Sequence, residues 1–122
     1  MRSLSSYREL VVWQKSMDLT VRIYAVSRGF PADERFGITS QMRRAASSIP
    51  ANIAEGQARN TTGEFLHSLG IARGSLAELE TFVELCERLE YIDRPICERL
   101  SNDCTEISKM LNALMKSLST RH

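Results

Sequence analysis

The stretch from Gly37 to Arg59 combines apolar residues at helical spacing with a proline in its middle. A helix advances about 100° per residue, so residues three and four apart share one face. One face of this stretch is apolar, and a polar face lies roughly a quarter-turn away. The pattern predicts a helix over about residues 36–58. Its core face holds Ile38, Met42, Ala45, Ile49, Ile53 and Gly56.

Pro50 lies inside this predicted helix. Proline has no backbone N–H, and its ring displaces the carbonyl four residues earlier, at a cost of roughly 3 kcal/mol. We therefore expect a kink at Pro50, with Ser47 or Ser48 satisfying the backbone groups that it frees. The kink either fits the curvature of a helical bundle, which is the simpler interpretation, or directs the polar face toward a partner.

The face opposite the core of this helix is made of small residues. A surface helix normally carries charged residues there. We therefore expect the helix to be enclosed on several sides, by this chain or by a second copy, which is a first indication of a homo-oligomer. The small residues are Ser40, Ser47, Ala51, Ala54 and Ala58.

Three further segments, about residues 8–29, 62–90 and 94–118, show the same periodicity. Short connections between helices make neighbours antiparallel. The sequence predicts an all-α protein: a single domain over residues 1–122 that forms an up-down-up-down, left-handed four-helix bundle with a kinked second helix. The first helix has the apolar stripe Leu10, Trp13, Met17, Val21 and Tyr24.

The third helix carries two rows of residues at bundle spacing. Gly70 and Gly74 favour close backbone approach there at a cost in helix propensity. Glu78 falls in the second row, and a buried carboxylate needs a partner, for which Arg44 and Asn52 are the candidates. The first row holds Phe65, Leu69, Ala72, Leu76, Leu79, Val83 and Cys86, and the second holds Ile71, Ser75, Glu78, Phe82, Leu85 and Leu89.

The net charge of +1 argues against a strong electrostatic nucleic-acid binder. Residues 1–30 are mostly basic and residues 61–93 mostly acidic. These charges pair either within one bundle, which is the simpler interpretation, or across a subunit interface. We expect Arg43 and Arg44, with Arg59 nearby, either to form salt bridges or to contact phosphate. Phosphate contact would need an oligomer, because one pair of arginines per chain neutralises too few phosphates for useful affinity.

The candidate chemistry is sparse. The three cysteines read as free thiols in a reducing cytoplasm, since no secretory signal or membrane-spanning run is present. Glu64 and His67 match half of a di-iron motif, but the only other histidine is His122, so we expect no metal, cofactor or catalytic site.

Several motifs together resemble a known bacterial family of four-helix bundles, that of the 23S ribosomal RNA intervening-sequence protein, to which the accessory variability protein of diversity-generating retroelements is related. The run from Ser48 to Gly56 is the most specific. The other segments are 10–17, Phe30-Pro31 with Glu34, 39–46 and 71–80.

The resemblance implies a ring-like homopentamer, no known catalysis, and a link to RNA or to a nucleic-acid-processing protein. It also implies a strip of polar residues, shared with the family, none of which is catalytic. The strip corresponds here to Gln41, Arg44, Ser48, Asn52, Glu55, Gly56, Arg73, Ser75 and Glu78.

We therefore predict a non-enzymatic, cytoplasmic, oligomeric helical module associated with RNA or a ribonucleoprotein. The alternative is a protein–protein interaction scaffold with no nucleic-acid role. The candidate binding residues are Arg43, Arg44, Arg59 and Arg73, and the structural strip comprises Gln41, Ser48, Asn52, Glu55, Gly56, Ser75 and Glu78.

Overall fold

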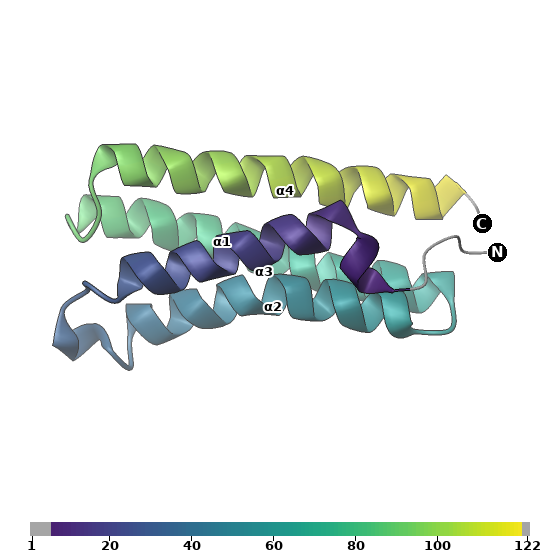
Figure 1. Cartoon of the computed structure of the whole chain (residues 1–122), viewed down its shortest axis with the longest axis horizontal. Coiled ribbons are helices and arrows are strands. Elements are labelled where there is room, and N and C mark those ends of the chain that lie inside the picture. Colours follow the sequence, from purple (N-terminus) through teal and green to yellow (C-terminus); the bar gives the residue numbers. More distant parts are fainter. Residues whose placement is uncertain (1–5, 121–122) are drawn as a thin grey trace.

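The computed structural model describes residues 6–120, which form four long helices side by side and contain no β-strand (Figure 1). The chain turns back at each connection, so α1 begins and α4 ends at the same end of the bundle. The predicted all-helical, four-helix class is confirmed; a left-handed sense and a kink at Pro50 stay predictions. The helices are α1 (Val11–Ser27), α2 (Ile38–Ala58), α3 (Thr62–Arg88) and α4 (Arg94–Thr120), with short 3-10 helices at Tyr7–Glu9 and Ala32–Glu34.

Each helix packs on two neighbours, α1 and α3 both lying between α2 and α4. The core runs along the centre of the bundle, where every apolar position predicted for α2 is buried. The first row of α3 is buried in the same way. The fully buried large side chains are Leu19, Ile23, Met42, Ile49, Ile53, Leu69, Leu76, Leu79, Val83, Leu100, Ile107 and Leu111.

The apolar stripe predicted for the first helix is wrong beyond Leu10 and Trp13, which are partly buried against the core. Met17, Val21 and Tyr24 are exposed, and α1 instead buries a neighbouring stripe that contains two serines. Those serines tolerate burial because their hydroxyls donate to carbonyls of their own helix, Ser16 to Trp13 at 2.9 Å and Ser27 to Tyr24 at 3.2 Å. The buried stripe is Val12, Ser16, Leu19, Ile23 and Ser27.

Pro50 leaves the carbonyl of Ala46 without its helical donor. The prediction that Ser47 or Ser48 would compensate is wrong, because Thr20 of α1 lies closest: its hydroxyl is 3.1 Å from the Ala46 carbonyl oxygen. The same hydroxyl is 2.8 Å from the Ser16 carbonyl, so its single proton is shared between two acceptors. The proline in α2 is thus matched by a threonine in α1.

The small-residue face of α2 is only partly enclosed by the described residues. Ala51 and Ala58 are exposed and Ala54 is half-buried, although Pro50 itself is buried. The expected close approach at Gly70 and Gly74 is also absent, since a Cβ atom at either position would meet no atom within 4 Å. The expected enclosure of Ala51, Ala58, Gly70 and Gly74 is therefore absent within residues 6–120.

Gly56 is where α2 and α3 do approach closely. A Cβ atom on Gly56 would lie 2.7 Å from the Cβ atom of Ser68 and 2.9 Å from Cδ1 of Phe65. The α2–α3 turn is then fixed by an N-cap, in which the Thr61 hydroxyl accepts from the Glu64 amide at 3.1 Å. A glycine therefore sets the spacing of the two helices that carry the polar strip.

None of the helices within residues 6–120 has an apolar stretch long enough to span a bilayer.

Candidate interaction surface

A groove of about 400 Å³ runs between α2 and α3. At its floor the hydroxyls of Ser48 and Ser75 lie 2.8 Å apart and join the two helices. The Asn52 amide donates to the Ser48 carbonyl at 2.8 Å and to the Ser48 hydroxyl at 3.0 Å. The groove is lined by Phe36, Ser40, Gln41, Arg44, Ala45, Ser48, Ser75 and Glu78. Three members of the predicted strip thus form one hydrogen-bonded link across the α2–α3 seam.

Arg44 and Glu78 lie on this groove without contacting each other. Both are exposed, and neither side chain forms an ion pair or a hydrogen bond with any residue between 6 and 120. The expected pairing of Glu78 with Arg44 or Asn52 is therefore wrong. Glu78 escapes the cost of burial because its own side chain is exposed on α3. The groove presents one free cation and one free anion.

Arg43 is held by α1 and not by an acid. Its Nε donates to the Ser27 hydroxyl at 2.8 Å, and its guanidinium lies 4.7 Å from the centre of the Tyr24 ring. A terminal nitrogen is 3.4 Å from the Tyr24 carbonyl near the end of α1. A cation suits the carbonyl end of a helix because the helix dipole is negative there. Arg43 is therefore engaged inside the chain.

Arg59 and Arg73 are engaged as well. Arg59 forms an ion pair with Glu55 at 2.6 Å and lies 4.0 Å from Glu64; the hydrogen bond that it donates to Glu55 is the main cause that raises the pKa of Arg59. Arg73 donates to the Asn112 side chain of α4 at 3.2 Å.

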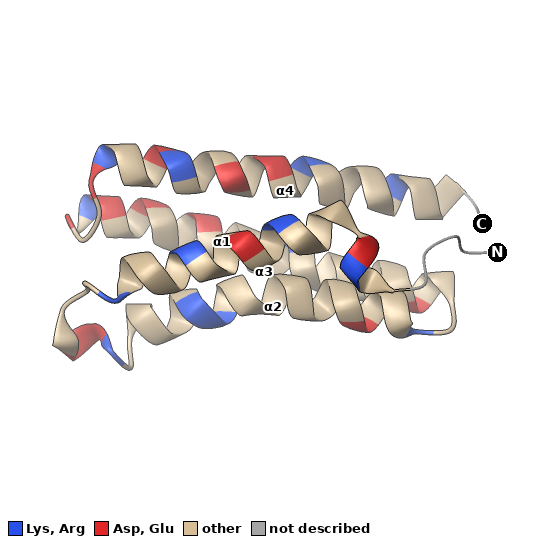
Figure 2. Cartoon of the chain, viewed as in Figure 1, with Lys and Arg blue, Asp and Glu red and all other residues tan. Residues whose placement is uncertain are grey.

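The four candidate arginines are therefore not brought together. Figure 2 shows charges of both signs along α1 and α4, while α2 is largely uncharged between a basic band near its start and the charges near its end. Arg43 and Arg44 are adjacent in sequence, but one turns to α1 and the other lines the α2–α3 groove. No joint phosphate-binding cluster results.

Several apolar side chains are exposed, which the sequence did not lead us to expect. Phe36, just before α2, is 86% exposed and lines the α2–α3 groove. On α3, the row predicted as a second buried seam leaves Ile71, Leu85 and Leu89 exposed. The sequence signal for Phe36 is an aromatic residue in a charged connection, where no helical period can bury it.

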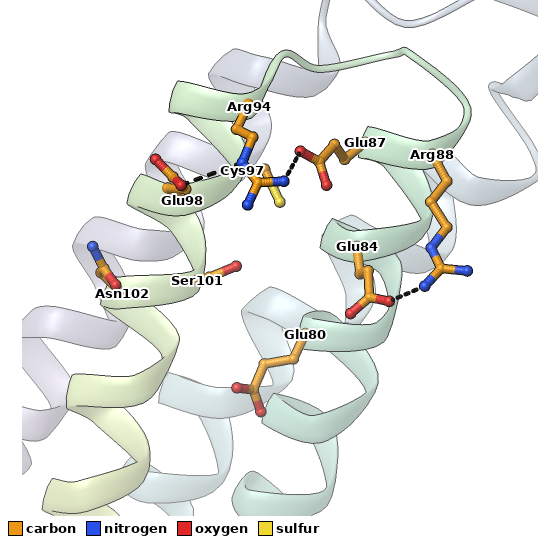
Figure 3. A pocket seen from close by; sticks show the side chains of 9 residues that line it. All are labelled: Glu80, Glu84, Glu87, Arg88, Arg94, Cys97, Glu98, Ser101 and Asn102. Carbon is orange, nitrogen blue, oxygen red and sulfur yellow. Dashed lines mark hydrogen bonds and ion pairs between the residues drawn. The ribbon is translucent and has the colours of Figure 1, made fainter.

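A larger cleft of about 640 Å³ lies between α3 and α4 (Figure 3). One ion pair joins its two walls, that of Arg94 with Glu87 at 3.6 Å. Arg94 also lies 3.4 Å from Glu98 within α4, and Arg88 lies 2.8 Å from Glu84 within α3. Burial raises the pKa of the Cys97 thiol at this cleft, which keeps the sulfur protonated and a poor nucleophile. The cleft combines these paired charges with Glu80, which has no ion pair within residues 6–120, and an unactivated thiol.

The other two thiols are deeper. Burial raises the pKa of Cys86 to about 11 and that of Cys104 to about 12. The Cys86 sulfur lies 3.9 Å from the sulfur of Met42, so it packs as a small apolar group in the α2–α3 seam. Within the described chain, no three histidine, cysteine or acidic side chains gather in a metal-binding arrangement.

Comparison with known proteins places this arrangement in a family. The model of the 23S rRNA-intervening sequence protein family matches residues 8–113. A solved protein of unknown function from the S23 ribosomal protein family of Bacteroides thetaiotaomicron is 36% identical, with a TM-score of 0.81; the match covers 87% of this chain and 96% of that one. No curated protein matches the chain. The resemblance seen in the sequence is confirmed, and the chain belongs to the 23S rRNA-intervening sequence protein family.

Proposed function

We propose that this chain is a non-catalytic helical module that assembles with copies of itself and works by surface contact. The observation that carries this proposal is the unpaired α2–α3 surface, on which Arg44, Glu78 and Phe36 all lie exposed. Phe36 and the charges of Arg44 and Glu78, which have no partner within residues 6–120, offer a second molecule an apolar contact and ion pairs. A ring of five copies and a cytoplasmic location stay predictions from the sequence.

The residues of the α3–α4 cleft support a role in binding other molecules rather than in catalysis. The α3–α4 cleft is lined mostly by paired charges and by a thiol whose pKa is raised. A nucleophile or general base needs a pKa moved toward the working pH, and these thiols move away from it.

Light scattering of the purified protein over a range of concentrations tests self-association. We expect a mass that is a multiple of the 13.8 kDa chain at micromolar concentration. A mass equal to one chain at every concentration would contradict the proposal.

Association with RNA is a second candidate, favoured by the description of the family and by Arg44. Arg44 is the one member of the four predicted arginines whose side chain is unengaged within residues 6–120. One cation per chain neutralises too few phosphates for strong binding, so this candidate depends on an assembly that multiplies it.

Filter binding to a structured RNA at two salt concentrations tests the second candidate. If Arg44 contacts phosphate, Arg44→Ala should weaken binding and reduce the salt slope by about one for each phosphate that is no longer neutralised. Arg99→Ala, which removes an exposed arginine on α4, is the matched control. RNA binding that is absent at low salt, or that does not depend on salt, would exclude association with RNA through phosphate contacts.

A further inference from the structure

The α2–α3 groove holds charged and polar groups that the chain leaves unused. It is lined by the Gln41 amide, the Arg44 guanidinium and the Glu78 carboxylate, and none of these side chains bonds to another group within residues 6–120. A guanidinium is a planar fork of N–H donors, and an ionised carboxylate only accepts. The groove volume of about 400 Å³ lies within the range of small-molecule sites, roughly 300–1,000 Å³. The groove therefore offers one cation and one anion to a small ligand.

The floor of the groove has a hydroxyl proton to spare. The hydroxyls of Ser48 and Ser75 carry two protons, and the single hydrogen bond between them uses only one. The Asn52 amide donates to the Ser48 hydroxyl at 3.0 Å, which occupies a lone pair of that oxygen and not its proton. Neither hydroxyl donates to any other group within residues 6–120. One of these two half-buried hydroxyls can therefore donate to a ligand in the groove.

We infer that this groove binds a small zwitterion of the α-amino-acid class, which carries a carboxylate and an ammonium close together. The carboxylate accepts hydrogen bonds from Arg44 and from the floor hydroxyl, and the ammonium pairs with Glu78. Guanidinium–carboxylate pairs are frequently bidentate, and hydrogen bonds to ionised groups are stronger than neutral ones. A ligand with one charge would leave Arg44 or Glu78 unpaired, and a phosphate would be repelled by Glu78. This binding goes beyond the self-association proposed above and does not require copies to assemble.

Phe36 gives the groove a preference for an apolar ligand side chain. This residue lines the groove and is 86% exposed, so the described chain does not cover its ring. An aliphatic side chain that packs on the ring removes apolar surface from water, which favours binding. Leucine should therefore bind more tightly than glycine, by roughly threefold or more.

Calorimetric titration with leucine and with its two halves tests the need for both charges. Isocaproate has the carboxylate and the same branched chain but no ammonium, and isoamylamine has the ammonium but no carboxylate. We expect leucine to bind roughly tenfold more tightly than either half, because only leucine pairs with both Arg44 and Glu78. Inorganic phosphate, which carries negative charge alone, should bind more weakly than leucine.

Two variants assign each charge of the ligand to its partner. Arg44→Gln removes the cation and should weaken leucine binding roughly tenfold, while isoamylamine binding stays the same. Glu78→Gln removes the anion and should weaken leucine binding to a similar extent, while isocaproate binding is not weakened. The matched controls are Glu80→Gln, an unpaired carboxylate on α3 outside the groove, and Arg99→Gln, an exposed arginine on α4. Both controls should bind leucine as the wild type does, and circular dichroism checks that every variant is folded.

Leucine binding that is weakened by both groove variants and by neither control supports the site. No saturable leucine binding at millimolar concentration overturns it. Equal affinity for leucine, isocaproate and phosphate also overturns it, because the groove would then be a simple anion site. Light scattering of the same samples keeps the two proposals apart. If copies assemble but leucine does not bind, the zwitterion site fails and self-association stands; if a single chain binds leucine, self-association fails and the zwitterion site stands.

Discussion

The α2–α3 seam and the α1–α4 seam are held together by different means. Across α2–α3, the helices approach at Gly56 and are joined by the short Ser48–Ser75 hydrogen bond. Across α1–α4, long side chains form ion pairs: Lys15 with Glu106 at 3.2 Å and Arg22 with Asp103 at 3.1 Å. Close backbone packing tolerates no added atoms, whereas partly exposed ion pairs adapt and are screened by salt. The α2–α3 seam should therefore be the rigid half of the molecule.

The largest effect expected is at Gly56. Gly56→Ala should lower the free energy of unfolding by about 1–3 kcal/mol, because its Cβ atom would overlap Ser68 and Phe65 and force the helices apart. This loss outweighs the gain of roughly 1 kcal/mol that alanine brings to a helix. Urea unfolding measures it. Gly70→Ala is the matched control, since its Cβ atom meets nothing within 4 Å and should stabilise α3. Equal effects at both glycines would show that the α2–α3 approach is not tight.

The sequence predicted the bundle well because a helical period is a local property. The core face of α2 and the first row of α3 needed only the spacing of large apolar residues. The stripe of α1 was misassigned because two apolar stripes are available and the buried one includes Ser16, whose burial depends on a hydrogen bond that composition does not show.

The candidate surface was less predictable, because pairings between helices depend on tertiary geometry. The sequence predicted the polar strip, but it could not predict that Arg43 contacts α1 while Arg44 lines the α2–α3 groove. A periodic row on α3 looks the same whether another helix covers it or not. The sequence therefore could not separate a buried seam from an exposed face such as that of Ile71 and Leu85.

The next effect lies where α1 meets α2, at the carbonyl freed by Pro50. Thr20→Val keeps the shape of the side chain but removes the hydroxyl, so it should cost about 1–2 kcal/mol by leaving the buried Ala46 carbonyl unpaired. Pro50→Ala restores the helical donor. In that background Thr20→Val should cost much less. The double-mutant cycle, measured by urea unfolding, isolates this coupling. Equal costs in both backgrounds would mean that Thr20 acts only through packing.

Unfolding at alkaline pH probes two buried thiols, Cys86 in the α2–α3 seam and Cys104 on α4. Burial raises the pKa of Cys104 from 9.0 to about 12, so the folded chain keeps a proton that the unfolded chain loses. Stability from this thiol is complete below about pH 9 and falls as pH rises toward 12, by up to about 1.4 kcal/mol per pH unit. Cys104→Ala should flatten the decline of unfolding free energy over that range. Cys86→Ala should flatten it only up to about pH 11. An unchanged slope in both variants would rule out these thiols as its cause.

The smallest effect is expected at the α1–α4 ion pairs. Arg22→Gln removes the ion pair with Asp103, whose side chain is only partly buried, and should cost less than about 1 kcal/mol at low salt. In 1 M salt, where screening acts within roughly 3 Å, the difference from wild type should disappear. Arg88→Gln breaks a pair within α3 and serves as the control for removing a charge away from the seam. A loss of stability at Arg22 that matches the Gly56 variant and resists salt would mean that the α1–α4 seam is as rigid as the α2–α3 seam, because only a desolvated pair in fixed geometry escapes screening.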